Sequence, residues 1–177
     1  MRTRKAVAAL AAVAAVGASA LVIGPAVAAG GGGQAQLRIV GGVTLKPGQS
    51  ITDDQRFAAR NLRVRSGQTV RLRNRARTED PHTLSLVRRG DLPRRPADAF
   101  NCEACGPFFG AHEVNEETGD VGQPVVNVGA EGFDQPGDSI FVPPGGTVRF
   151  DVTADRGRTL YYLCAVHPWM QGKFRVR

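Results

Sequence analysis

Short segments in which apolar and polar residues alternate recur along this chain of 177 residues, and turn-forming Gly, Pro, Asp and Asn residues separate them. Side chains of a strand point alternately to its two faces, so one face of each segment is expected to be buried. No long amphipathic helix is evident. The pattern predicts an all-β fold, an antiparallel sandwich or barrel. In Leu62-Arg63-Val64-Arg65 and Val70-Arg71-Leu72-Arg73, it places four arginines together on the face opposite the core.

A set of metal-binding side chains lies near the C-terminus. In Cys164-Ala165-Val166-His167-Pro168-Trp169-Met170, which follows the strand-like run 159–163, a thiolate, an imidazole and a thioether are spaced three residues apart. His82 begins another alternating segment, 82–87, and supplies a second imidazole. One Cys, two His and a weak axial Met form a mononuclear copper site for electron transfer. The four donors therefore indicate one copper ion, although His82 could be a turn residue and Met170 a core residue.

The loop from Cys164 to Met170, with Pro168 inside it and Gly172-Lys173 after it, resembles the loop of the small blue copper proteins, amicyanin in particular. The resemblance covers about residues 57–87 and 139–177. It includes two related strand segments, 62–70 and 140–148, that share a Gly before Thr-Val. It implies a cupredoxin-like antiparallel Greek-key β-sandwich in which His82, Cys164, His167 and Met170 bind one type 1 copper ion.

The resemblance also assigns roles to neighbours of these ligands. Thr83 stands where the family often has Asn, and its hydroxyl could still tie the two ligand loops together. In the family, the imidazole that corresponds to His167 reaches an apolar surface patch through which electrons pass. Pro168 and Trp169 would form part of that patch here, while packing in the core is an equal alternative for Trp169.

The N-terminal residues have the composition of an export signal. Arg2, Arg4 and Lys5 precede the apolar run 6–23, and Ala26-Val27-Ala28 follows as a small-residue cleavage site. We predict a secretory signal peptide at 1–28, with a retained membrane anchor as the alternative. A flexible Gly-rich segment, 29–35, would then lead into one domain, 36–177. The protein is expected to be exported, and so periplasmic, cell-surface or secreted.

An insertion at about residues 88–138, rich in Gly, Pro and acidic residues, separates the two ligand segments. In an oxidising compartment, Cys102 and Cys105 are expected to form a local disulfide, which leaves Cys164 as the free thiol. A second metal site made of Cys102, Cys105 and His112, with Glu113 as fourth donor, is the alternative.

A thioredoxin-like redox pair is less favoured, because Gly106-Pro107 follows Cys105 where a helix would be needed. Phe108 and Phe109 would cap the sandwich or give the insertion an apolar face beside the copper.

Together these features predict a one-electron carrier between exported or membrane-attached redox partners, and not an enzyme. The alternative is extracytoplasmic copper binding, sequestration or delivery. A catalytic copper protein would need further His-rich sites, and the chain has only three His.

The arginines on the predicted strands suggest that the redox protein partners are acidic, although a solvated face that blocks edge pairing is the plainer interpretation. No nucleic acid is expected as a partner, because those strands lack the interleaved aromatic residues of a single-strand binder. No small-molecule substrate is expected either. We expect a monomer.

Overall fold

The computed structural model describes residues 33–115 and 117–177. The predicted signal peptide, 1–28, and most of the segment 29–35 lie outside the described residues. The strands are β1 (Ala35–Val40), β2 (Val43–Lys46), β3 (Ser50–Asp53), β4 (Arg56–Phe57), β5 (Asn61–Val64), β6 (Gln68–Asn74), β7 (His82–Val87), β8 (Val125–Val126), β9 (Ser139–Val142), β10 (Thr147–Val152), β11 (Thr159–Leu163) and β12 (Gln171–Val176). The helices are a 3-10 turn, η1 (Arg89–Asp91), and two short α-helices, α1 (Pro96–Phe100) and α2 (Gly106–Ala111). Within the described residues, no helix is long and apolar enough to cross a membrane.

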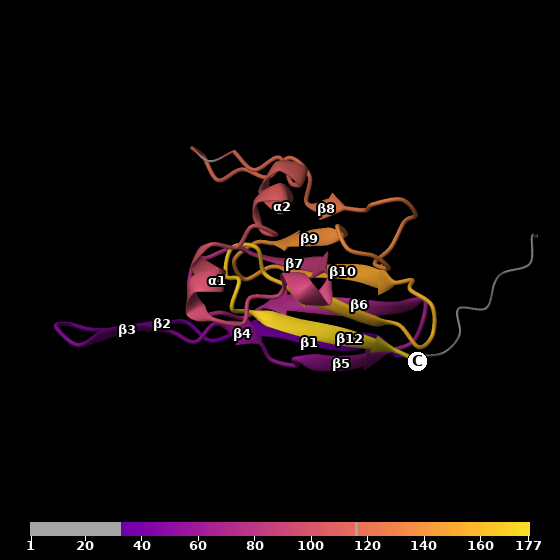
Figure 1. Cartoon of the computed structure of the whole chain (residues 1–177), viewed down its shortest axis with the longest axis horizontal. Coiled ribbons are helices and arrows are strands. Elements are labelled where there is room, and N and C mark those ends of the chain that lie inside the picture. The colour runs from indigo at the N-terminus through magenta and orange to yellow at the C-terminus, as the bar shows by residue number, and fades with distance from the viewer. Residues whose placement is uncertain (1–32, 116) are drawn as a thin grey trace, which may run out of the picture. The chain divides into compact units, whose positions relative to one another are not determined.

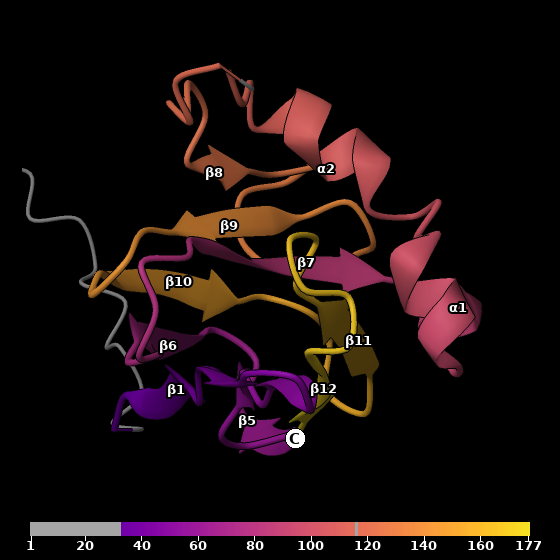
Figure 2. The same ribbon diagram turned by 90° about the vertical axis from the view of Figure 1, so that its left-hand side faces the viewer.

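Two sheets form a sandwich, as the alternating pattern predicts (Figures 1 and 2). The first has the strand order β10-β6-β1-β4 and the second β5-β12-β11-β7-β9-β8, while β2 and β3 form a separate hairpin. Most neighbouring strands are antiparallel, but β1 pairs with β6 and β5 pairs with β12 in parallel. The all-β sandwich prediction is confirmed, with sheets that are mixed in strand direction.

The core fills the space between the two sheets with alternate residues of their strands. In β1, for example, Leu37 and Ile39 are buried while Arg38 between them is exposed. Tyr162 of β11 is fully buried and lies directly opposite Gly172 of β12. A Cβ atom at Gly172 would come within 2.4 Å of the Tyr162 hydroxyl oxygen, so only glycine leaves room for this ring.

The predicted single arginine face is wrong, because β5 and β6 belong to different sheets. On the first sheet, Arg73 lies opposite Arg38 of β1, and Arg71 lies opposite Arg149 of β10. On the second sheet, Arg63 of β5 lies opposite Arg175 of β12. Alternation assigned the arginines to outer faces correctly, but it could not tell which strands share a sheet.

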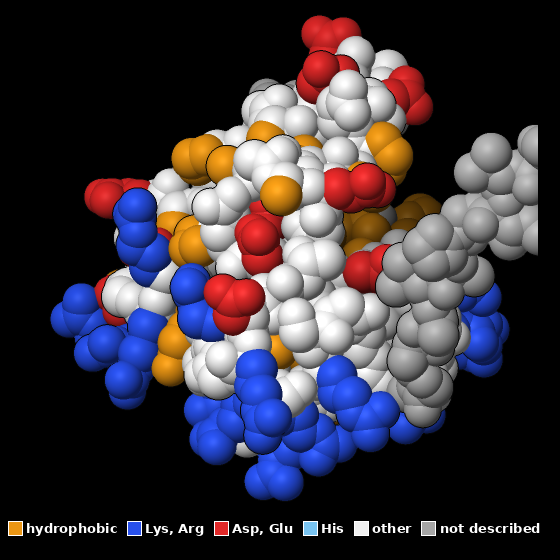
Figure 3. All heavy atoms as spheres, turned by 90° about the vertical axis from the view of Figure 1, so that its right-hand side faces the viewer, with side chains coloured by type: hydrophobic (Ala, Val, Ile, Leu, Met, Phe, Trp, Pro, Cys, Tyr) orange, Lys and Arg blue, Asp and Glu red, His pale blue; other side chains and the backbone are white. Residues whose placement is uncertain are grey.

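Charge is also divided between the sandwich and the insertion. In Figure 3, Lys and Arg side chains gather along the lower edge, the level of β1 and β5 in Figures 1 and 2. Acidic side chains stand out at the upper end, the level of α2 and β8. The sequence agrees, since residues 88–138 contain 10 acidic and 4 basic residues.

The insertion is a structured layer that covers one face of β7. It contains η1, α1 and α2, and its strand β8 pairs with β9 at the edge of the second sheet. Phe108 of α2 packs with Val87, Leu163 and Ala165 in a second apolar cluster, so all six residues of β7 are buried. Capping of the sandwich is therefore the role of Phe108, whereas Phe109 is partly exposed.

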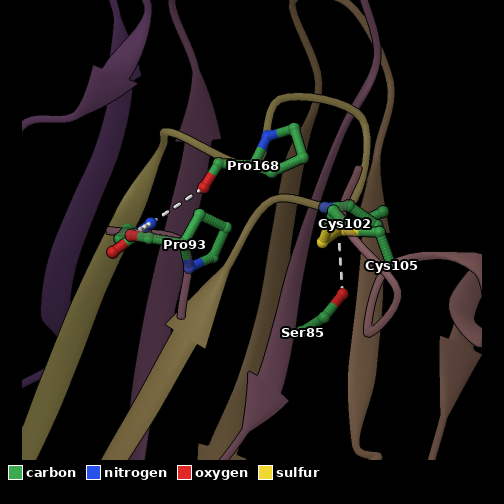
Figure 4. Close-up of a disulfide and its surroundings, with 8 residues drawn as sticks. Ser85, Pro93, Cys102, Cys105 and Pro168 are labelled. Carbon is green, nitrogen blue, oxygen red and sulfur yellow. Dashed lines mark hydrogen bonds between the residues drawn. A yellow bond between two sulfur atoms is a disulfide. The ribbon is translucent and has the colours of Figure 1, made fainter. Parts of the chain in front are cut away.

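The disulfide between Cys102 and Cys105 is confirmed, and its surroundings include Ser85 of β7 (Figure 4). Cys164 is the free cysteine, as predicted. The expectation that no helix follows Cys105 is wrong, because α2 begins at Gly106. Pro107 falls in the first turn of α2, where its missing N–H costs no hydrogen bond within the helix.

Candidate metal centre

Strand pairing brings the two ligand segments to the same end of the second sheet. His82 is the first residue of β7, and Cys164 directly follows β11. These two strands are neighbours, with Leu163 opposite Ser85. The loop after Cys164 is closed by two backbone hydrogen bonds, from the Cys164 N–H to the Met170 carbonyl at 3.0 Å and from the Met170 N–H to the His167 carbonyl at 2.8 Å. The loop thus returns toward Cys164 before β12 begins.

Three of the four predicted ligands converge. The Cys164 Sγ lies 3.7 Å from the Nδ1 of His82 and 3.9 Å from the Nδ1 of His167. The metal-binding atoms of the three residues all lie within 4.8 Å of one another. With metal–nitrogen and metal–sulfur distances of about 2.0 and 2.3 Å, as in zinc sites, a trigonal arrangement separates sulfur from nitrogen by about 3.7 Å. The three side chains therefore fit a trigonally coordinated metal ion.

Met170, the fourth predicted ligand, is fully buried and belongs to the same core cluster as Cys164. Its backbone closes the ligand loop, which holds its main chain next to those of Cys164 and His167. Its role as the axial ligand remains a prediction.

Burial sets the protonation of the site. His82 and Cys164 are fully buried, and His167 is 8% exposed. Burial, with a smaller effect of His167, lowers the pKa of His82 to about 4. Burial also lowers the pKa of His167 and raises the pKa of the Cys164 thiol. Both imidazoles are thus neutral at pH 7 and free to bind a metal, while the thiolate needs a compensating cation.

Thr83 links the two ligand loops, as its hydroxyl was predicted to do. Its backbone N–H donates to the Cys164 Sγ at 3.3 Å, and its Oγ1 accepts the N–H of Ala165 at 2.8 Å. Thr83 is itself buried. One residue next to His82 thus positions both the ligand sulfur and the backbone that follows it.

The outer edge of His167 is covered by polar groups, which corrects the expectation of an imidazole edge reaching an apolar surface. Its Nε2 lies 3.4 Å from Gln55 Nε2 and 3.8 Å from Asp80 Oδ2. Gln55 is 1% exposed and has no counterpart in the sequence motif. The hairpin β2–β3 ends just before it, so only the folded chain brings it to His167.

Trp169 is the exposed aromatic group of the ligand loop. Its ring meets that of His167 edge to face, with centroids 5.2 Å apart, and 43% of the residue is exposed. Both interpretations of Trp169 therefore hold in part, because it packs on a predicted ligand and also forms surface.

A groove of about 390 Å³ lies beside Trp169, between the ligand loop and α1. Phe100, which is 84% exposed, and the basic residues Arg60, Arg94 and Arg95 line it. Gln171 joins its two sides, since its Nε2 donates to the carbonyls of Pro93 and Pro168 at 2.8 and 3.0 Å (Figure 4). The insertion thus forms one side of the surface next to the site.

The alternative metal site in the insertion is not formed. The sulfurs of Cys102 and Cys105 are bonded to each other. His112 is buried, with its ring nitrogens bonded to the Gln123 carbonyl and to Ser139. The sequence did not indicate that His112 would bond to Ser139, nor that Ser139 would lie opposite Ser85 through the pairing of β7 with β9.

No protein-family model matches the chain, and no curated protein matches it in sequence. Several solved structures are similar in fold. A purple cupredoxin from Nitrosopumilus maritimus has a TM-score of 0.44 at 17% identity, over 81% of this chain and 99% of that one. Auracyanin A, a blue copper protein from Chloroflexus aurantiacus, has a TM-score of 0.41 at 22% identity, over 82% and 100%. A mutant of amicyanin in its Cu(I) form has a TM-score of 0.38 at 16% identity, over 79% and 82%.

Proposed function

We propose that this protein is an exported, mononuclear type 1 copper protein that carries single electrons between redox partners and is not an enzyme. The observation that supports this most is the convergence of one buried sulfur and two imidazole nitrogens within 4.8 Å. His82, Cys164 and His167 would hold the metal, with Met170 as the weak axial ligand. Bound copper would supply a Cu(II)/Cu(I) couple, for which this mixture of ligands suits both oxidation states.

Hydrogen bonds within the chain itself hold these donors in place. His82 is fixed in β7 by pairing with Val142, and Cys164 is fixed by the Thr83 N–H and by the closed loop. Pro168 restricts the backbone of that loop further. Little movement is then needed when the charge of the site changes, which favours fast electron transfer.

Electrons would leave through the His167 and Trp169 edge, and the groove beside it would contact the partner. Arg60 and Arg94 flank the exposed Phe100 and Trp169 there. An acidic redox protein with an apolar contact residue fits this surface, because opposite charges raise the rate of encounter.

Copper delivery or sequestration is the rival function. It requires a ligand set that a receiving protein can reach. In the described structure, His82, Cys164 and Met170 are fully buried, which favours the electron carrier. Rapid loss of Cu(I) to a strong chelator would support delivery instead.

The visible spectrum tests the proposed function. The protein from residue 29 onward, loaded with Cu(II), should show an intense thiolate-to-copper charge-transfer band. The band should disappear with ascorbate and return on reoxidation. A Cys164→Ser variant should lack it. A weak band in the wild type, like that of ordinary Cu(II), would refute Cys164 as a ligand.

Rates with small redox reagents of opposite charge test the contact surface. Compared with the wild type, the reduced Arg60→Glu/Arg94→Glu variant should be oxidised more slowly by anionic hexacyanoferrate. The same variant should be oxidised faster by a cationic ruthenium ammine. Arg149→Glu is the control, because it changes the net charge of the protein on the first sheet and leaves the groove intact. Equal effects per charge at Arg149 and at the groove would argue against docking there.

A further inference from the structure

A chain of buried polar side chains runs from the insertion to the ligand loop. His112 Nε2 lies 2.8 Å from Ser139 Oγ, and Ser139 Oγ lies 2.7 Å from Ser85 Oγ. Ser85 donates to Thr83 Oγ1 at 2.9 Å, and the same oxygen accepts the Ala165 N–H at 2.8 Å. All five residues are at most 4% exposed. The predicted ligand set uses none of the first three.

The hydrogen-bonded series from His112 to Thr83 has few hydrogens to share, because each hydroxyl can donate only one. At the far end, the Gln123 carbonyl can only accept, so Nδ1 of His112 carries a hydrogen. In the neutral imidazole, Nε2 must then accept the hydrogen of Ser139. In the charged imidazole, Nε2 donates to Ser139 instead.

The two states direct the hydroxyls differently. When His112 is charged, Ser139 can donate to Ser85, and Ser85 can donate to Thr83. When His112 is neutral, Ser139 donates to His112, and Ser85 is drawn toward Ser139. Thr83 then loses the bond from Ser85. A hydroxyl that accepts a hydrogen bond is a stronger donor itself.

Thr83 passes this difference to the site. Its backbone N–H donates to the Cys164 sulfur at 3.3 Å, and burial raises the pKa of the Cys164 thiol while the Thr83 backbone and side chain both act to lower it. Hydrogen bonds to a ligand sulfur tune the reduction potential of a metal site. A stronger bond favours the reduced, less positive state, so charging His112 should raise the potential.

We infer that His112 is a positioning residue that sets the reduction potential of the copper site from the insertion, through Ser139, Ser85 and Thr83. The inference rests on the proposed function. It gives the insertion a role beyond covering β7, because the insertion supplies the titratable end of the chain.

Few other groups can interfere with this titration. Neither α2 nor β9 carries a titratable side chain, and the only one in β7 is His82. The Glu113 carboxylate lies over Gly122, and Asp138 accepts the N–H groups of Val128, Asp134 and Gln135. Burial lowers the pKa of His112, and the bond to the Gln123 carbonyl opposes this effect. The imidazole is thus neutral at pH 7 and becomes charged in acid.

The first test uses the copper-free protein. Long-range proton–nitrogen NMR of ¹⁵N-histidine-labelled protein should show His112 with hydrogen on Nδ1 at pH 7, and uptake of a second proton at a midpoint below 6.5. Hydrogen on Nε2 at pH 7 would overturn the inference, because the hydroxyl directions would then be fixed. This result does not depend on copper, so it is separate from failure of the proposed function.

The second test measures the potential of the copper-loaded protein against pH. In the wild type, the potential should rise as pH falls through the His112 midpoint. His112→Gln and Ser139→Ala should both lose that rise, although Ser139→Ala keeps the imidazole. Any titration of His82 or His167 persists in both variants and can be subtracted. Wild-type pH profiles in both variants would refute the inference. Should Ser139→Ala not fold, Ser85→Ala interrupts the same chain one step further on.

Discussion

Replacement of Thr83 by valine tests how the two ligand loops are held together before any metal binds. Valine keeps roughly the volume of threonine and replaces its hydroxyl by a methyl group. The hydroxyl oxygen accepts hydrogen bonds from the Ala165 N–H and from Ser85. Ser85 can turn to Ser139, 2.7 Å away, but the buried Ala165 N–H is left without its acceptor. Such an unpaired buried donor costs about 1–3 kcal/mol.

The assay is urea unfolding of the copper-free protein, because a bound metal would also tie the loops together. The free energy of unfolding should fall by about 2 kcal/mol. In a thermal unfolding experiment, the same loss would lower the Tm by roughly 4–8 °C for a domain of this size. Thr83→Ser is the control, since it keeps the oxygen and loses one methyl, at about 0.8 kcal/mol. If Thr83→Val were as stable as Thr83→Ser, the hydroxyl would not be what joins the loops.

Three further predictions concern the site and the insertion. Met170→Leu should keep copper bound and raise the reduction potential, because a weak donor that stabilises Cu(II) is lost; voltammetry checks this, and failure to bind copper would contradict a weak axial role. Since the pKa of His82 is lowered to about 4, the copper-free protein should be most stable above pH 6.5 and lose stability toward pH 4, where the unfolded chain binds a proton that buried His82 does not. Urea unfolding at several pH values measures this loss, which should be smaller in His82→Gln. Replacing Cys102 and Cys105 by serine opens a four-residue loop and should cost about 2 kcal/mol in chain entropy, with thermal unfolding as the measurement and an unchanged Tm as the contrary result.

The insertion covers β7, and this changes the hydrogen bonding of the polar side chains on that strand. In a sandwich with one solvated face, Thr83 and Ser85 of β7 would bond to water. Here α2 and β8 close that face, so Ser85 bonds to Thr83 and to Ser139, and Ser139 bonds to His112. Because Phe108 helps to cover this face, the buried hydroxyls must bond to one another, whereas on an exposed sheet they would bond to water.

Features that are local in the chain could be predicted from the residues alone. The spacing of Cys164, His167 and Met170 lies within one loop, and period-two alternation identified β6, β7 and β11 because it depends on neighbouring residues only. The close pair Cys102 and Cys105 could likewise be read as a disulfide. His82 was located by its place at the start of a strand.

Features that depend on long-range strand pairing became visible only in the folded chain. The arginines of β5 and β6 separated into two sheets, Gln55 reached His167, and His112 joined the network of β7 and β9. Alternation states which side chains share a face of one strand, but it says nothing about which strands become neighbours. That choice comes from the burial of the whole core, and so only the folded chain shows what surrounds the ligands.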